Sequence, residues 1–204
     1  MDEHETLSQK NETSEGFELE NHKKEKLVID LVYANIFGIL VLVPTVLLSG
    51  IPYFLIWRNT LAVKLPQFFN LKYLIAGVVI FFLGIVAHEL IHGIVFAKYA
   101  KSGFRAIKFG ILLKMLTPYC HCKEMLKVKH YLIGAVMPAI ILGIIPLIVA
   151  LCTGNPGILF FGILFTVAAS GDFLMIKLLW KEDKESWVQD HPSEAGCYIY
   201  RRIN

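Results

Sequence analysis

Four long apolar stretches constrain the fold of this chain more than any other feature. A helix needs about 20 mostly apolar residues to cross a bilayer. The stretches that reach this length span residues 31–57, 73–97, 131–152 and 158–176. The 204-residue chain is also 55% hydrophobic and only 18% charged, which leaves too few polar side chains to cover a soluble domain of this size. The sequence therefore predicts an all-α polytopic membrane protein with four transmembrane helices.

The distribution of Lys and Arg predicts the orientation of these helices. By the positive-inside rule, basic residues gather in the loops and tails on the cytoplasmic side. Of the 20 Lys and Arg residues, 17 lie in the N-terminal tail, between the second and third stretches, or after the fourth. We therefore expect an integral, multi-pass protein of the plasma membrane with both termini in the cytoplasm. Its expected partners are the lipid bilayer and a membrane-protein or peptide substrate, and the net charge of +3 gives no reason to expect nucleic acid.

The loop between the second and third stretches contains a pattern typical of a β-strand. From Phe109 to Met115 the odd positions are all apolar and the even positions are mixed. This period of two favours a short strand or, together with residues 117–122, a hairpin in the cytoplasmic loop. An amphipathic segment lying on the membrane surface would give the same pattern and remains the alternative.

Three ionisable residues lie close together inside the second apolar stretch, where such residues are expensive and mark functional sites. They form the H-E-x-x-H pattern His88-Glu89-Leu90-Ile91-His92. Residues four apart lie on the same face of a helix, so both imidazoles can reach one metal ion. Bound zinc lowers the pKa of its water to about 7, and Glu89 is placed to take the proton of that water as a general base. The pattern predicts a zinc site with His88 and His92 as ligands and Glu89 as the catalytic residue; a polar cluster that only joins neighbouring helices is the alternative.

A catalytic zinc usually has three protein ligands, and Asp172 is the leading candidate for the third. The second and fourth stretches cross the membrane in the same direction, and His88 and Asp172 lie 15 and 14 residues after their starts. At about 1.5 Å per residue, both residues reach a similar depth. Gly171 is expected to let the two helices approach closely. The alternative is that Asp172 only caps a helix or forms an ion pair near the membrane surface.

A second group of metal-capable residues lies in the loop, at Tyr119-Cys120-His121-Cys122. His121 is a candidate auxiliary ligand, or a stabiliser of the oxyanion that forms during peptide hydrolysis. Cys120 and Cys122 could form a second metal site, although one C-x-C with one His is weak evidence. After the last stretch, the segment His191 to Glu194 is predicted to be a solvated tail, with folding back over the active site as the alternative.

These residues give the chain a resemblance to a known family. The stretches His88 to Gly93, Pro118 to Cys122, Ser170 to Asp172 and His191 to Gly196 resemble the small membrane proteins described as putative zincin peptidases. That family is similar to intramembrane metalloproteases of the site-2 protease type. The resemblance implies a zinc-dependent membrane endopeptidase that hydrolyses membrane-associated proteins toward the cytoplasmic side. It implies Zn²⁺ held by His88, His92 and Asp172, with Glu89 as the general base. The alternative is a metal-binding membrane protein without hydrolytic activity, such as a transporter or a sensor.

These assignments divide the chain into three parts. Residues 1–26 are polar and contain no apolar segment, so they are predicted to form a disordered cytoplasmic N-terminal tail. Residues 27–180 are predicted to form a transmembrane metallopeptidase-like domain. Residues 181–204 are predicted to form a cytoplasmic C-terminal segment.

Overall fold

The computed structural model describes residues 21–64, 66, 70–112, 117–191 and 194–203, and helices make up most of this part. In chain order the α-helices are α3 (Leu31–Thr45), α4 (Ile51–Lys64), α5 (Leu71–Tyr99), α6 (Val128–Pro138), α7 (Ile145–Thr153), α8 (Pro156–Ala168) and α9 (Ser170–Leu179). Two π-helical turns, Val46–Gly50 and Ala139–Ile144, join α3 to α4 and α6 to α7. The pair α6 and α7 is thus joined without a break, whereas the rod of α3 and α4 is kinked at Trp57, whose backbone is not helical (φ −116°, ψ 16°).

Among the described residues, three helices are long and apolar enough to cross a membrane: Val32–Lys64, Leu71–Tyr99 and Val128–Thr153. Helices α8 and α9 make a fourth span if the pair, bent by 42° at its break, is counted as one. The predicted spans are thus confirmed as three or four helices of sufficient length. The first extends beyond its expected end, and the fourth is bent.

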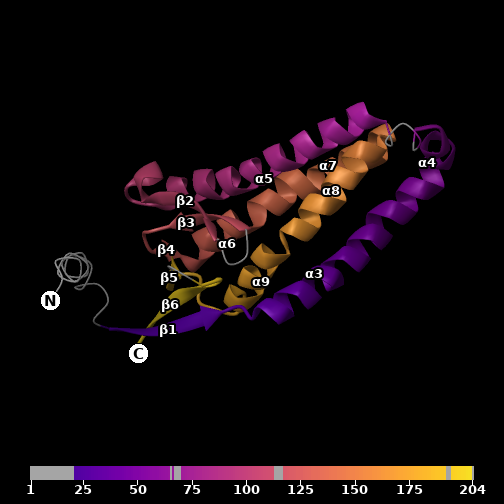
Figure 1. The fold of residues 1–204 in the computed structure, drawn as a ribbon. Helices are drawn as coiled ribbons and strands as arrows, with labels where there is room; N and C mark the ends of the chain where they lie inside the picture. Colours follow the sequence, from indigo (N-terminus) through magenta and orange to yellow (C-terminus); the bar gives the residue numbers. More distant parts are fainter. Residues whose placement is uncertain (1–20, 65, 67–69, 113–116, 192–193, 204) are drawn as a thin grey trace.

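The helices are arranged with α3 and α5 on opposite sides and with α6 to α9 between them (Figure 1). Glycines permit the closest approaches: a Cβ on Gly84 would lie 2.2 Å from Phe165, and one on Gly162 would lie 2.9 Å from Leu147. The expected role of Gly171 is wrong, because a Cβ there would meet nothing within 4 Å. Helix packing therefore depends on glycines elsewhere in the bundle.

A tight turn joins α7 and α8 as a helical hairpin. Gly154 ends α7 in the left-handed conformation with φ of 63°, and the Asn155 side chain caps α8 by accepting from the backbone N–H groups of Gly157 and Ile158. The Tyr53 hydroxyl donates to the Gly154 carbonyl over 2.9 Å. Helix α4 thereby holds this turn at the end of the bundle remote from the strands (Figure 1).

Two small antiparallel sheets gather at the other end of the helices (Figure 1). The strands are β1 (His22–Val28), β2 (Ile107–Leu112), β3 (Thr117–Cys122), β4 (Leu126–Lys127), β5 (Trp187–Asp190) and β6 (Gly196–Arg202). Strands β2 and β3 pair as a hairpin with Phe109 opposite Cys120. This confirms the predicted hairpin; residues 113–116 lie outside the described part of the chain. The other sheet has the strand order β1-β6-β5-β4.

The four-stranded sheet corrects three expectations. We expected an all-α protein in which the loop hairpin was the only β-structure, but β1, β4, β5 and β6 form a second sheet. The end of the predicted disordered tail belongs to β1, whereas residues 1–20 lie outside the described residues. The C-terminal segment, for which no strands were expected, contributes β5 and β6, whose Val188, Cys197 and Ile199 are fully buried against the ends of the helices. Burial of these apolar side chains anchors β5 and β6 close to the candidate site.

Candidate metal centre

Helix α5 presents His88, Glu89 and His92 on its inner side, near the strand end of the bundle. The helix begins after Asn70, whose side chain accepts from the Lys72 N–H over 3.0 Å, and it stays regular through the motif. The two histidines are each 7% exposed. Because they lie one turn apart on an unbroken helix, their rings face the same neighbours.

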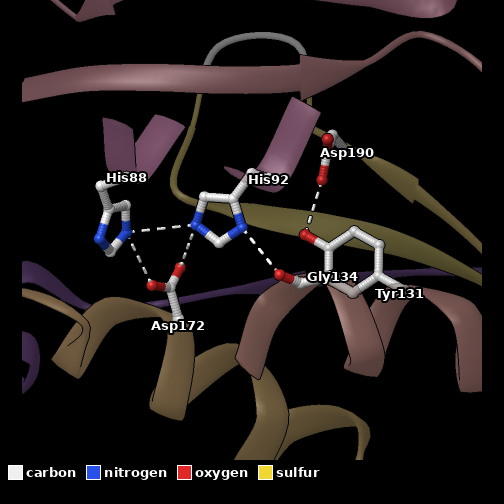
Figure 2. A network of polar contacts seen from close by, with 6 residues as sticks. All are labelled: His88, His92, Tyr131, Gly134, Asp172 and Asp190. Carbon is white, nitrogen blue, oxygen red and sulfur yellow. Dashed lines mark hydrogen bonds and ion pairs between the residues drawn. The ribbon is translucent and has the colours of Figure 1, made fainter. Parts of the chain in front are cut away.

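Asp172 completes a compact group with the two histidines (Figure 2). Its Oδ2 lies 3.1 Å from His88 Nε2, and its Oδ1 lies 3.2 Å from His92 Nε2. The two Nε2 atoms are 3.2 Å apart. Helix α9 starts just before Asp172, after the bend at Ala169, so the carboxylate projects from its first turn toward α5. The structure therefore brings Asp172 together with His88 and His92, as expected from the similar membrane depth predicted for His88 and Asp172.

The spacing of these three side chains suits a tetrahedral metal. Zinc bonds of about 2.0–2.1 Å to nitrogen and oxygen place the corners of a tetrahedron about 3.3 Å apart. The two Nε2 atoms are 3.2 Å apart, close to that value, and each has a different carboxylate oxygen of Asp172 at 3.1–3.2 Å. Among the described residues, this is the group of His, Cys, Asp and Glu whose ligand atoms converge, all within 4.8 Å of one another. His88, His92 and Asp172 could therefore hold a metal ion.

Hydrogen bonding around His92 supports the same conclusion. Its Nδ1 lies 3.0 Å from the Gly134 carbonyl oxygen of α6, an acceptor, so Nδ1 carries a proton and donates it (Figure 2). In the neutral ring, Nε2 then has a free lone pair directed at His88 and Asp172. Metal-ligating histidines usually donate their other ring N–H in this way. A cation between these groups would satisfy lone pairs that otherwise repel one another.

Glu89 lies outside the three-atom group but lines the same cavity, which has a volume of about 310 Å³. The backbone N–H of Cys120 in β3 interacts with its carboxylate. His88, His92 and Asp172, which we call the metal group, border the cavity on one side. Strand β3 and the C-terminal residues His191 and Gly196 border it on the other sides. A carboxylate next to a metal group, in a cavity bordered by a strand, can accept a proton from water bound there.

The loop residues occupy different places from those expected of metal ligands. His121 lines the cavity, but its Nδ1 lies 3.8 Å from Asp190 and the residue is not part of the converging group. Cys120 also borders the cavity, whereas Cys122 is buried in the hydrophobic core. Burial raises the pKa of both thiols, that of Cys122 to about 11. Neither thiol belongs to the converging group, so among the described residues the geometry places no second site at these cysteines.

The described residues just after β5, His191 and Glu194, border the cavity. His191 and Glu194 both line it, and Glu194 forms an ion pair of 2.6 Å with Lys26 of β1. The two described ends of the predicted solvated tail thus border the cavity, as the alternative of folding back had it, whereas residues 192–193 lie outside the described part of the chain. The pairing of β1 with β6 supplies the physical reason, because it holds Glu194, which lies just before β6, next to Lys26 of β1.

Three residues near the metal group were missed by sequence reasoning: Gly134, Tyr131 and Asp190. Gly134 supplies the carbonyl that His92 contacts, and the Tyr131 hydroxyl donates to Asp190 over 2.7 Å (Figure 2). Gly134 contacts His92 through its backbone carbonyl, which every residue has, so the amino-acid type at position 134 could not predict this contact. Asp190 could have been found only by recognising that β5 packs beside β3.

A comparison with protein families identifies the chain. The model of the family described as "putative zincin peptidase" matches residues 81–187, just over half of the sequence. The chain belongs to this family. The region shared with the zincin-peptidase family contains His88, Glu89, His92, Asp172 and the whole β2–β3 hairpin, whereas β1 and β6 lie outside it. No curated protein and no solved structure matches the chain.

Proposed function

We propose that this protein is a zinc-dependent membrane endopeptidase with His88, His92 and Asp172 as zinc ligands and Glu89 as general base. The convergence of two imidazoles and a carboxylate, beside a second carboxylate in the same cavity, is the observation that carries the proposal. When bound, zinc would act as a Lewis acid that polarises a peptide carbonyl and acidifies water. Membership in the zincin-peptidase family supports the same reaction class.

The residues of the chain have separate roles in the proposed hydrolysis. Glu89 takes a proton from the attacking water and delivers it to the nitrogen of the departing amine, so that the peptide C–N bond breaks and one water is consumed. His121 borders the cavity and stabilises the negative charge that develops on the carbonyl oxygen. His92 is held in position by the Gly134 carbonyl. The side chains thus supply proton transfer, charge stabilisation and orientation.

We infer that the substrate is a membrane-associated protein cut near the cytoplasmic surface. The cavity lies toward the strand end of helices that are long enough to cross a membrane. The basic residues of the loops and tails favour a cytoplasmic location for this end. A peptide bond is cut in an extended conformation, and β3 offers a strand beside the metal group along which an extended segment can lie.

Replacement of Glu89 tests the proposal. Wild type, Glu89→Gln and the surface control Glu185→Gln are purified, reconstituted in liposomes with a library of single-span membrane peptides, and assayed by mass spectrometry and metal analysis. Glu185 is a suitable control because it lies on the surface and pairs with Lys127 and Lys129 far from the cavity lining.

We expect both variants to retain zinc, because neither Glu belongs to the converging group. Glu89→Gln should lose cleavage by about 100-fold to 10,000-fold, the usual contribution of a general base. Glu185→Gln should cleave like wild type. Equal cleavage by wild type and Glu89→Gln would remove Glu89 as the base. Zinc without cleavage by wild type would instead indicate a non-hydrolytic metal-binding protein.

A further inference from the structure

Asp190, the last residue of β5, joins three elements around the cavity. Its Oδ1 accepts a hydrogen bond of 2.7 Å from the Tyr131 hydroxyl of α6 (Figure 2). Its Oδ2 accepts one of 2.8 Å from the backbone N–H of Cys122 and lies 3.8 Å from Nδ1 of His121. The Asp190 side chain is only 12% exposed. One buried carboxylate therefore contacts both the backbone and a ring at the end of β3.

These contacts determine how the His121 ring is presented. A carboxylate can only accept hydrogen bonds, so Nδ1 facing Asp190 is favoured to carry a proton. His121 also lines the cavity, so we expect Nε2, the ring nitrogen that does not face Asp190, to be the one available there. The hydrogen bond to Cys122 fixes the neighbouring backbone, which limits movement of the ring away from the metal group.

The surroundings of Asp190 act on its pKa in two opposite directions, with the effect of burial the larger. Burial raises the pKa of the carboxyl, and the donors of Tyr131 and Cys122 together with nearby His121 oppose that effect. Hydrogen bonds donated to a carboxylate stabilise its charge.

We propose that Asp190 is a positioning residue that holds His121 with Nδ1–H toward β5 and Nε2 toward the cavity. The consequence for catalysis rests on the proposed peptidase function, whereas the ring orientation does not. Asp190 lies beyond the region matched by the family model, which ends at residue 187. The four-stranded sheet thus contributes directly to the site that the helices form.

Asp190→Asn separates a charge effect from a structural one. The amide oxygen can still accept from the Cys122 N–H, and the amide nitrogen can donate to the Tyr131 hydroxyl, so both hydrogen bonds can persist. The charge facing His121 is lost. Asp183→Asn is the matched control, because Asp183 is exposed and contacts only the local backbone at Glu185.

The first measurement is nitrogen NMR of histidine side chains in the full-length protein in detergent micelles, with His121→Ala to assign the His121 signals. In wild type we expect His121 Nδ1 to be protonated. In Asp190→Asn we expect the His121 signals to shift, whereas in Asp183→Asn they stay. An unprotonated Nδ1 in wild type overturns the proposal even if the variant fails to fold, and unchanged signals in folded Asp190→Asn also overturn it.

The second measurement is cleavage of the single-span peptide library. We expect Asp190→Asn to lower kcat by about 10-fold to 100-fold, less than the 100-fold to 1000-fold typical for loss of an oxyanion donor itself. KM should change by less than about twofold, and zinc content should not change. In a His121→Ala background, Asp190→Asn should cause no further loss, because the two residues act as one unit.

Additive losses in the double variant would show that Asp190 does not act through His121. Failure of wild type to cleave any peptide would overturn the peptidase function, and the NMR result would still decide whether Asp190 positions His121.

Discussion

Gly134 offers a sharp test of how packing supports the metal group. Its carbonyl accepts the Nδ1–H of His92, and a Cβ on Gly134 would lie 2.1 Å from Cε1 and 2.5 Å from Cδ1 of Phe96. The Phe96 ring is stacked between the rings of His92 and Tyr131, with centroid distances of 5.8 and 5.2 Å. The ring therefore cannot move away from a new methyl group without displacing His92 or Tyr131.

The size of the effect of Gly134→Ala follows from these distances. Overpacking of this kind costs about 1–3 kcal/mol. Alanine recovers up to about 1 kcal/mol of helix propensity. From the middle of the overpacking range, about 2 kcal/mol, the net loss is about 1–2 kcal/mol, which corresponds to a fall in Tm of about 2–8 °C for a chain of this length. Displacement of the partner of His92 should also weaken zinc binding by about 10-fold to 100-fold.

Gly171→Ala is the matched control, because Gly171 adjoins Asp172 and its added Cβ would meet nothing within 4 Å. We expect its Tm and zinc affinity to equal or slightly exceed those of wild type. Tm is measured by intrinsic fluorescence in detergent, and zinc affinity by competition with a chelator. If Gly134→Ala matches wild type in both measurements, or if both variants lose affinity equally, the packing account of the metal group is refuted.

Three further outcomes follow. Asn155→Ala removes the cap of α8 and should cost about 1 kcal/mol, measured as a lower Tm. Hydrogen bonds from Arg201 lower the pKa of Glu182 in the folded protein below its unfolded value near 4.5. The stability that this ion pair contributes is therefore fully present above pH 4.5 and is lost as the pH falls through the folded-state pKa of Glu182. The Tm difference between wild type and Arg201→Leu should therefore be largest at pH 7 and shrink below pH 4; a constant difference would contradict this assignment. Zinc at a free concentration of 100 times its Kd should stabilise the folded protein by about 2.7 kcal/mol. Its removal by a chelator should lower Tm by the corresponding amount, and addition of zinc should restore it.

Local sequence patterns predicted two kinds of element: those held together by contacts between residues near in sequence, and the helices whose length must match the thickness of the bilayer. Apolar length identified the spans, alternation at Phe109 to Met115 identified the hairpin, and equal depth joined Asp172 to His88. These inferences succeed because helical rise and strand period are fixed by backbone geometry. The bend at Ala169 was not predicted, since neither proline nor glycine occupies that position.

The four-stranded sheet could not be predicted in the same way, because its pairing is non-local. Strand β1 pairs with β6, which places His22 opposite Arg202 across nearly the whole chain. β1 is rich in charge and its burial pattern is irregular, so its sequence resembles a solvated tail. In β6, the alternation of buried Cys197 and Ile199 was a usable signal that sequence analysis overlooked. The contacts of Asp190 depend on this sheet, and they became visible only in three dimensions.

The ligands of the metal are the central claim, and zinc-edge X-ray absorption of the purified full-length protein tests them most directly. The account predicts about one zinc per chain, bound by two imidazole nitrogens and by oxygen at about 2.0–2.1 Å, with no sulfur neighbour. The same measurement on Asp172→Ala should show the loss of carboxylate oxygen while the imidazole signal remains. A sulfur neighbour at about 2.3 Å would place the metal at Cys120 or Cys122 and would contradict the site formed by His88, His92 and Asp172.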